Sequence, residues 1–371
     1  MSTLRCPLCG GDTKRFGKTS AGAQRWQCKL CKATFTHSIN NDAKLLREFL
    51  NWLLSRRRQT DMPGYGRTFR RKAQRFWELW PLPPLIDEIH RVVYVDGIYI
   101  AKDVVVLIAC NDEHVLGWYL ARSENTRAWK ALLSRIAPPD MVVSDGGQGL
   151  GGAIQEVWQG TAVQRCTFHA FCQVKRHTTL HPNLEAGKEL LQLARRLLKV
   201  KTIDEARVWV VDLSGWNTKW QRFLNEYSII EGRRVYTHER LRKARRGLNG
   251  LMNQGTLFTY LDPILSKDGP LPATNNRIEG GINAQLRHML QDHRGLSTLK
   301  RIKAVFWWCY MHTECPGSPA DILKTMPRDK DIDDLYHRSS QAQAQKDEPG
   351  WGDAVLWHEL HQAGPYRMDW D

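Results

Sequence analysis

Two aspartates stand in contexts where a carboxylate needs a special partner. Asp96 interrupts the apolar stretch VVYVDGIYI, and Asp145 ends the stretch MVVSD directly before two glycines. A buried aspartate is costly unless it is hydrogen-bonded or bound to a cation, and Mg²⁺ or Mn²⁺ prefers carboxylate oxygens. Two such ions, about 3.5 to 4 Å apart, activate the attacking oxygen and stabilise the leaving oxygen when a phosphodiester is displaced. The pair predicts a divalent-metal site, although Asp145 can instead be a turn residue before Gly146 and Gly147.

A second possible metal site lies near the amino end of the sequence. It consists of two CxxC pairs separated by 18 residues, namely Cys6, Cys9, Cys28 and Cys31. Each pair can place two thiolates on one Zn²⁺ ion, and four thiolates leave that ion no open position, so residues 1–38 predict a structural zinc ribbon. The alternative is that these cysteines are redox-active or merely buried. Basic and aromatic residues between the pairs would line the ribbon for contact with DNA or a partner.

The charge balance of the sequence is strongly positive. Lys and Arg number 54 against 39 Asp and Glu, a formal net charge of +15. Clustered Lys and Arg bind nucleic-acid phosphates through counterion release, whereas acidic substrates and anionic membranes are the competing partners. The apolar run at 104–110 is far shorter than the ~20 residues that span a bilayer, and the amino end has no apolar signal core. We therefore expect a cytoplasmic protein without a membrane partner, whose cysteines stay reduced.

Residues 39–84 show a helical pattern with basic side chains. LLREFLNWLL places apolar residues on one helix face, the segment 61–66 interrupts the helix, and RTFRRKAQRFWELW resumes the pattern before Pro81. This arrangement is similar to a helix-turn-helix, whose second helix enters the major groove of DNA with its amino end first. The basic residues that would then contact phosphates or bases are Arg67, Arg70, Arg71 and Lys72. The alternative is an ordinary helical hairpin with a solvated basic face.

Residues 88–182 predict the core that carries both aspartates. RVVYVDGIYI, VVVLIAC and HVLGWYLA are joined by short polar turns, which is typical of three antiparallel strands. A helix, the strand MVVSD, a second helix, a short strand and a third helix follow. This order is that of the RNase H fold, an α/β fold with a mixed sheet and helices on both faces. It places Asp96 on the first strand and Asp145 at the carboxyl end of the fourth, and these two strands are expected to be neighbours.

The sequence resembles the mutator-like transposases of bacterial insertion sequences over residues 92–310. Those proteins belong to the DDE superfamily and have an RNase H-like catalytic domain. The residues that carry the resemblance are VDG at Asp96, SDGGQGL at Asp145, CTFH with Cys166 and His169, and NNRIEGGINAQLR with Glu279. In that family two aspartates and a glutamate bind the catalytic metals, and the Cys and His form a signature element. The resemblance therefore implies that Asp96, Asp145 and Glu279 are catalytic and bind Mg²⁺ or Mn²⁺, as two ions.

The same resemblance implies an activity and its partners. Water would first attack a phosphodiester to free a 3′ hydroxyl, which would then attack target DNA without a covalent protein intermediate. The expected partners are the terminal inverted repeats of the protein's own insertion sequence and target DNA, bound by a homodimer or higher assembly at the nucleoid of a bacterial cytoplasm. One alternative is an inactive or domesticated descendant that regulates by binding DNA. The other is a general nuclease that cuts without regard to end sequence.

The spacing of the carboxylates indicates an insertion. Asp145 and Glu279 are 134 residues apart, too many for one strand, one helix and a connection. Residues 183–268 have a helical pattern and match the all-helical insertion of the family, so residues 269–315 would supply the closing helices. The tryptophans of this insertion are predicted to be core residues and not base-stacking groups, namely Trp209, Trp216 and Trp220. A basic run can hold phosphate or form a solvated helix face, and it comprises Arg240, Arg242, Lys243, Arg245 and Arg246.

Three further segments of the sequence can be interpreted in more than one way or carry a separate prediction. Glu279 can be a first-turn glutamate that interacts with the helix dipole. Cys166 and His169 can be half of a zinc site, but no second pair at ligand spacing is evident, so we expect a packing or metal-adjacent structural role. Other potential ligands on the same segment are Cys172, His177 and His181. Residues 316–371 are polar, and we expect a tail that is partly disordered.

Overall fold

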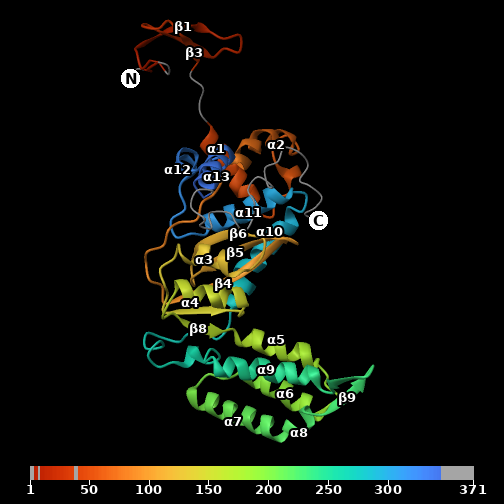
Figure 1. Ribbon diagram of the computed structural model, residues 1–371. Coiled ribbons are helices and arrows are strands. Elements are labelled where there is room, and N and C mark those ends of the chain that lie inside the picture. Colours follow the sequence, from red (N-terminus) through yellow and green to blue (C-terminus); the bar gives the residue numbers. More distant parts are fainter. Residues whose placement is uncertain (1–3, 7–8, 37–40, 344–371) are drawn as a thin grey trace.

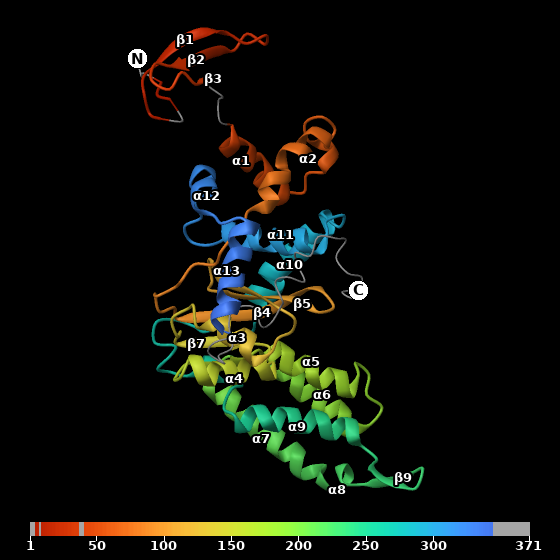
Figure 2. The same cartoon turned by 45° about the horizontal axis from the view of Figure 1, so that its top comes forward.

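The computed structural model describes residues 4–6, 9–36 and 41–343. A small antiparallel sheet near the amino end lies apart from the larger body in both views (Figure 1, Figure 2). Its strands are β1 Thr13–Lys18, β2 Gln24–Cys28 and β3 Thr34–Thr36. Among the described helices, none combines the length and the apolar character needed to cross a bilayer.

A five-stranded mixed sheet forms the centre of the body. Its strands are β4 Val92–Ala101, β5 Val104–Cys110, β6 Val115–Ala121, β7 Met141–Ser144 and β8 Ala162–Arg165. Their order across the sheet is β6-β5-β4-β7-β8; the first three pair antiparallel, and β7 and β8 run parallel to β4. The predicted meander and the predicted adjacency of the first and fourth strands are confirmed. The β-branched runs that signalled these strands fill the buried surfaces of the pleated sheet.

Helices cover both faces of this sheet. They are α3 Thr126–Leu133 and α4 Gln148–Val157 on one face, and α10 Ala284–Asp292 and α11 Thr298–Met311 on the other. Val93 and Val95 pack with α3 and α4, whereas Val92 and Tyr94 pack with α10 and α11. Because successive side chains of a strand point to opposite faces, Asp96 shares the face of Val92 and Tyr94. The α10–α11 face is therefore the one that can supply partners to Asp96.

Helices from both ends of the described chain join the core on the α10–α11 face. They are α1 Asp42–Leu53, α2 Arg67–Ala73, α12 Pro319–Thr325 and α13 Asp329–Gln343, with the 3-10 turns Gln59–Asp61 and Gln74–Glu78. Phe49 and Trp52 of α1 are buried in the same core as α11. The imidazole of His293 lies 4.5 Å from the Trp52 ring, centroid to centroid, and its Nε2 is 2.9 Å from the carbonyl oxygen of Leu53. The amino-terminal helices thus share one hydrophobic core with the sheet.

The carboxyl-terminal segment differs from its prediction. The sequence predicts a polar and partly disordered tail from residue 316, whereas α12 and α13 occupy most of residues 319–343. The Ser318 hydroxyl accepts the N–H of Asp321 at 3.3 Å and so caps α12, and Pro319 occupies the first helical turn. Ile322 and Ile332 are buried in the main core. A few isolated apolar residues in a polar context hold these helices in place, and residues 344–371 of the expected tail lie outside the described residues.

A layer of helices lies on the far side of the sheet from α1 and α2 (Figure 1, Figure 2). Its elements are α5 Thr167–Thr178, α6 Glu185–Leu197, α7 Ile203–Lys219, α8 Gln221–Leu224, β9 Tyr227–Ile230, β10 Arg233–Tyr236, α9 Glu239–Asn253 and the 3-10 turn Thr259–Leu261. Trp209 and Trp216 are buried, and their indole N–H groups donate to the Leu193 and Ala186 carbonyls at 2.8 and 3.0 Å. Trp220 packs against the same core. The prediction that these tryptophans are core residues is confirmed.

The prediction of an all-helical insertion is wrong at one place. Strands β9 and β10 form an antiparallel hairpin in which Tyr227 faces Tyr236. The two turn residues between the strands, Glu231 and Gly232, have φ angles of 50° and 72°, as a type I′ hairpin turn requires. The stretch YSIIEGRRVY is rich in β-branched and aromatic residues, which favour strands. This strand pattern is short and lies between segments with helical periodicity, so the sequence was interpreted as helical throughout.

Lys303 of α11 has a fully buried side chain that joins three elements. Its Nζ donates to the carbonyl oxygen of Trp77 at 2.5 Å and forms an ion pair with Asp329 at the start of α13. Burial lowers the pKa of Lys303, and the charge of Asp329 opposes that change. Through these two contacts the buried ammonium group of Lys303 connects the amino-terminal helices to α11 and α13.

We expect the substitution Lys303→Met to lower the free energy of unfolding by about 3 kcal/mol, because the Trp77 carbonyl loses its donor and Asp329 loses a cation. Urea denaturation followed by tryptophan fluorescence measures this change. The matched control is Lys300→Met on the same helix, whose Nζ donates to the Gln74 side chain at 3.3 Å at the surface. Its expected effect is within about 0.5 kcal/mol. Equal losses in the two variants would contradict a special role for Lys303.

Candidate active site

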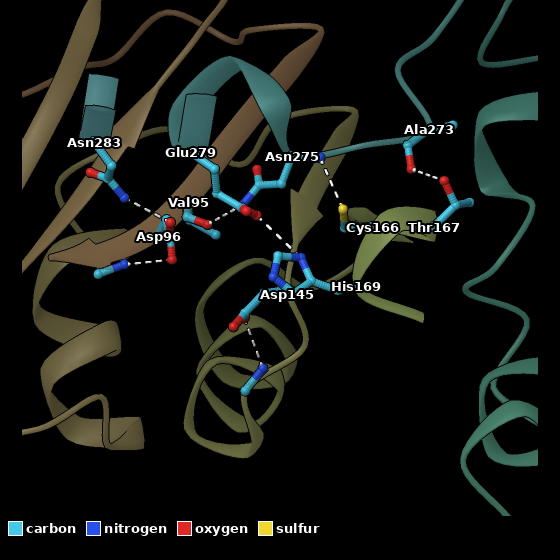
Figure 3. Close-up of polar contacts among 12 residues, drawn as sticks. Val95, Asp96, Asp145, Cys166, Thr167, His169, Ala273, Asn275, Glu279 and Asn283 are labelled. Carbon is cyan, nitrogen blue, oxygen red and sulfur yellow. Dashed lines mark hydrogen bonds and ion pairs between the residues drawn. The ribbon is translucent and has the colours of Figure 1, made fainter. Parts of the chain in front are cut away.

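Asp96 lies in the middle of β4 and accepts two hydrogen bonds. The backbone N–H of Gly97 donates to Oδ1 at 2.9 Å, and the side-chain amide of Asn283 donates to Oδ2 at 2.7 Å (Figure 3). Burial raises the pKa of Asp96 to about 6, and the nearby charge of Asp145 adds to this rise. The carboxylate is therefore held in a fixed orientation in a place where its own charge is costly.

Asp145 follows directly after β7, where the chain turns into α4. The backbone N–H of Gly147 donates to its Oδ1 at 3.1 Å. Gly146 has a φ of 85°, and a Cβ at this position would collide with the guanidinium of Arg165. Glycine is thus required here both by the left-handed backbone and by the close approach of Arg165. The turn interpretation and the site interpretation of Asp145 are compatible, because the charge of this turn residue also acts on the carboxyl of Asp96.

Glu279 lies in a π-helical segment, Arg277–Asn283, that continues into α10. Such wide turns are rare and occur often at functional sites. Its Oε1 is 3.2 Å from the Nδ1 of His169, as Figure 3 shows. Burial raises the pKa of Glu279 to about 7, and the charges of Asp96 and Asp145 add to the rise. The structure therefore brings together all three predicted carboxylates from segments 49 and 134 residues apart in the sequence.

Cys166 and His169 lie in the first turn of α5, against the segment that carries Glu279. The Cys166 Sγ accepts the backbone N–H of Asn275 at 3.2 Å, and the side-chain amide of Asn275 donates to the Val95 carbonyl at 3.1 Å. Burial lowers the pKa of His169, which favours its neutral form, and burial raises the pKa of the Cys166 thiol. Cys166 and Asn275 thus fasten α5 and the Glu279 turn to β4, one residue before Asp96.

Glu124 is a fourth carboxylate that the sequence analysis missed. It lies between β6 and α3, and burial raises its pKa to about 7, with the charges of Asp145 and Asp96 adding to the rise. A Cβ on Gly97 would lie only 2.7 Å from the Glu124 Oε1, so the absence of a side chain at Gly97 makes room for this carboxylate. Because β6 and β7 both run parallel to β4, their carboxyl ends meet at one edge of the sheet. An acidic residue three positions after the end of the third predicted strand was the available signal.

Arg165, at the end of β8, is a cation beside this group of acids. Burial lowers its pKa, and the charges of Asp145, Cys166 and Glu279 oppose the change. Among the described residues, its buried Nε and one terminal nitrogen have no hydrogen-bond partner. The charge of Arg287 also acts on Asp96 and Glu279, but two guanidinium groups leave part of the negative charge of four carboxylates unbalanced. Such a set of oxygen donors matches the ligands that Mg²⁺ or Mn²⁺ prefers.

The residues predicted to contact DNA lie on two elements at opposite ends of the body. All four on α2 are exposed, namely Arg67, Arg70, Arg71 and Lys72. On α9, Arg242 donates to the Leu224 carbonyl and the Asn225 side chain at 2.9 and 2.6 Å. Arg245 is half-buried, whereas Lys243 and Arg246 are exposed and approach Glu239 within 3.8 and 3.7 Å. Arg242 therefore has a structural role in the helical layer, and the exposed cations of α2 and α9 stay DNA-binding predictions.

The four amino-terminal cysteines form one cluster. Their sulfur atoms all lie within 4.8 Å of one another, with Cys6 to Cys31 at 3.6 Å and Cys9 to Cys28 at 3.5 Å. Four thiolates around one Zn²⁺ at about 2.3 Å are about 3.8 Å apart, so the cluster fits that ion closely. Burial opposes ionisation of Cys28, but hydrogen bonds from the backbone of Cys31 and Leu30 lower its pKa to about 6. The donor set is suited to a structural zinc site.

Comparison with known proteins places part of the chain in a family. Residues 85–230 match the family model described as "Transposase, Mutator family". Over this stretch the chain is similar to Mutator-family transposases. The match includes Asp96, Asp145, Cys166 and His169 and ends before Glu279. The resemblance found in the sequence analysis is confirmed.

A curated relative supports the same family. The transposase for insertion sequence element ISRM5 of Rhizobium meliloti (strain 1021) is 29% identical over 144 residues. The aligned part is 37% of this chain and 34% of that protein. The chain therefore matches about a third of the length of this relative.

The raised pKa values predict how pH acts on the metal-free protein. A carboxyl with a folded-state pKa above its unfolded value stabilises the fold at low pH, and this contribution is lost as pH rises through the folded value. For Asp96, Glu124 and Glu279 the loss falls between about pH 4 and pH 7. We expect Asp96→Asn to stabilise the metal-free protein by about 2 kcal/mol at pH 7.5 and by far less at pH 4.5.

Thermal melting in EDTA at the two pH values, with and without Mg²⁺, measures this effect. Mg²⁺ should raise the melting temperature of the unmodified protein at pH 7.5 and have little effect at pH 4.5, because protons and the ion compete for the same oxygens. The control Glu156→Gln removes an exposed carboxylate that pairs with Lys130, and it should keep both behaviours. An Asp96→Asn effect that is the same at both pH values would contradict the assignment.

Proposed function

We propose that this protein is a metal-dependent DNA transposase that cleaves and joins strands at the ends of its own insertion sequence. The observation that carries the proposal is the convergence of Asp96, Asp145 and Glu279 at one edge of the sheet of a Mutator-family domain. The strand order β6-β5-β4-β7-β8, with three antiparallel and two parallel members, supports an RNase H-like core. Its match to the strand order expected from the sequence strengthens the assignment.

The three carboxylates would hold the catalytic divalent ions. When bound, such ions would activate the attacking oxygen and stabilise the leaving oxygen of an in-line displacement. The Glu279 Oε1 is buried without a hydrogen-bond partner among the described residues, as expected of an oxygen kept for a cation. Glu124 stands beside the same edge and would add a fourth oxygen donor or orient water.

The surrounding residues would orient these ligands. The Asn283 amide and the Gly97 N–H fix the Asp96 carboxylate, and the Gly147 N–H fixes that of Asp145. Because their pKa values are raised toward neutrality, Asp96 and Glu279 would give up protons as the ions bind, so metal affinity should rise across pH 6 to 7. No side-chain nucleophile is needed when the attacking group is water or a 3′ hydroxyl.

The DNA would be held by basic elements outside the acidic edge. The cysteine cluster would bind one structural Zn²⁺ and present Arg15, Arg25 and their neighbours on a small sheet. In this sheet the guanidinium of Arg15 lies 5.9 Å from the Trp26 ring, an arrangement able to meet a phosphate backbone. The exposed cations of α2 would contact the terminal repeats. These contacts supply end recognition, whereas the carboxylates supply cleavage.

Cleavage of labelled duplexes that bear the sequences flanking the gene tests the proposal. We expect nicking at the element ends with Mg²⁺ or Mn²⁺, none in EDTA, and a fall on the order of 10²-fold or more in Asp96→Asn and in Glu279→Gln, since each removes part of a metal site worth several kcal/mol. Glu156→Gln is the matched control and should cut normally. Tight binding of the ends without cleavage by the unmodified protein would favour the DNA-binding regulator, and cleavage independent of end sequence would favour a general nuclease.

A separate experiment tests the zinc ribbon. We expect Cys28→Ser to lose one zinc ion per chain and to lose hydrogen-exchange protection in β1, β2 and β3, because a small metal-bound sheet has little core of its own. Protection of β4 to β8 should not change. The control Cys315→Ser alters an exposed cysteine outside the cluster, and metal content equal in the two variants would contradict the zinc assignment.

A further inference from the structure

We propose a second metal site beside the active site, formed by Cys166, His169 and Glu279 and suited to Zn²⁺ or a similar ion that accepts sulfur, nitrogen and oxygen ligands. The proposed catalytic function uses only hard, oxygen-bound ions, so this site goes beyond it. The sequence analysis expected a packing or metal-adjacent role for Cys166 and His169, because no further ligand pair lay nearby in the sequence. The structure supplies the missing ligand from a segment more than one hundred residues away.

The ligand atoms of the three residues converge. The Cys166 Sγ, a ring nitrogen of His169 and a carboxylate oxygen of Glu279 all lie within 4.8 Å of one another. The closest two, His169 Nδ1 and Glu279 Oε1, are 3.2 Å apart. A tetrahedral ion with bonds of about 2.0 to 2.3 Å keeps its ligands roughly 3.3 to 3.8 Å apart. Small side-chain rotations therefore bring this trio to the geometry of a three-residue zinc site.

Two of these atoms are buried without hydrogen bonds. Within the described part of the chain, neither His169 Nδ1 nor Glu279 Oε1 has a hydrogen-bond partner, although the two atoms face each other (Figure 3). Buried polar atoms without partners are uncommon, and each calls for an explanation such as a bound ion. A cation between an imidazole nitrogen and a carboxylate oxygen satisfies both at once. The missing hydrogen bonds of these two atoms support a bound ion separately from the suitability of Cys, His and Glu as ligands.

The surroundings of Cys166 resemble those of a metal-bound thiolate. Its Sγ accepts the backbone N–H of Asn275, and it lies at the amino end of the twelve-residue helix α5, near the backbone N–H groups of Phe168 and His169. These donors favour the thiolate and act against burial, which raises the pKa of the thiol. Asn275 is itself fully buried and anchored to Val95, so the sulfur has a rigid support. Supporting contacts of this kind orient metal ligands and raise their affinity.

The proposed site uses only some of the potential metal ligands on α5. Among the described residues, the candidate ligand groups are this trio and the amino-terminal cysteine cluster. Cys172 lies further along α5, half-buried and outside the trio, and His177 lies at the end of the same helix. Three protein ligands leave a fourth position open. If the proposed function holds, that position adjoins the acidic edge, and Glu279 can bridge the two sites through its two oxygens.

The experiment is a zinc count on the full-length protein, purified with Zn²⁺, dialysed, and measured by native mass spectrometry. We expect two zinc ions per chain in the unmodified protein, one for the ribbon and one for the trio, and one in Cys166→Ser and in His169→Asn. The matched control Cys172→Ser should keep two. His169 is partly exposed, so its variant keeps the test valid if Cys166→Ser folds poorly, and circular dichroism checks both. One ion in the unmodified protein, or two that survive both substitutions, would overturn the site.

A cobalt-substituted sample gives a second readout. The thiolate-to-cobalt absorption should decrease in Cys166→Ser and stay in Cys172→Ser, whereas Cys28→Ser removes the ribbon's share of the same band. This result does not depend on DNA cleavage. Asp96→Asn should lose cleavage and still bind two zinc ions. Two ions without any cleavage by the unmodified protein would overturn the proposed function alone, and cleavage with one ion would overturn this inference alone.

Discussion

The repulsion among buried carboxylates is the constraint on which the rest of the structure depends. Burial raises the pKa values of Asp96, Glu124 and Glu279 at one edge of the sheet, and the charge of Asp145 adds to each rise, with Arg165 as a neighbouring cation. Such a group stays together only if a rigid framework holds it, because each charge would otherwise move toward water. Three strands and a π-helical turn provide that framework. Backbone N–H groups and one asparagine amide fix the two aspartates.

The part of this framework that local sequence can specify was predictable. Long β-branched runs separated by polar turns indicated β4, β5 and β6, and the order of the following elements placed Asp96 and Asp145 on neighbouring strands. The contributions of Glu124 and Asn275 were not predictable, because they depend on contacts between segments far apart in the chain. Nothing in the neighbourhood of Asn275 shows that its backbone will approach Cys166, 109 residues earlier. The β9–β10 hairpin was missed for a local reason, a short strand signal inside a helical pattern.

The core that supports the acidic edge also reaches the ends of the described chain. α1 and α2 pack on the same side of the sheet as α10 and α11, and α13 is joined to them through Lys303. The basic helix α2 and the π-helical segment that carries Glu279 and Asn283 therefore bury side chains in one hydrophobic core. The exposed cations of α2 and the carboxylates are in this way connected through packed side chains.

The helical layer leaves and re-enters the sheet domain at almost the same point. The N–H of Thr167 donates to the Ala273 carbonyl at 2.9 Å, immediately before Asn275 bonds to Cys166. The chain between them is about one hundred residues long, but its two ends are fastened side by side. Closing a longer loop adds little entropic cost once its ends are pinned. The layer can therefore lengthen, shrink or be exchanged during evolution while Glu279 keeps its place, which makes it an interchangeable module.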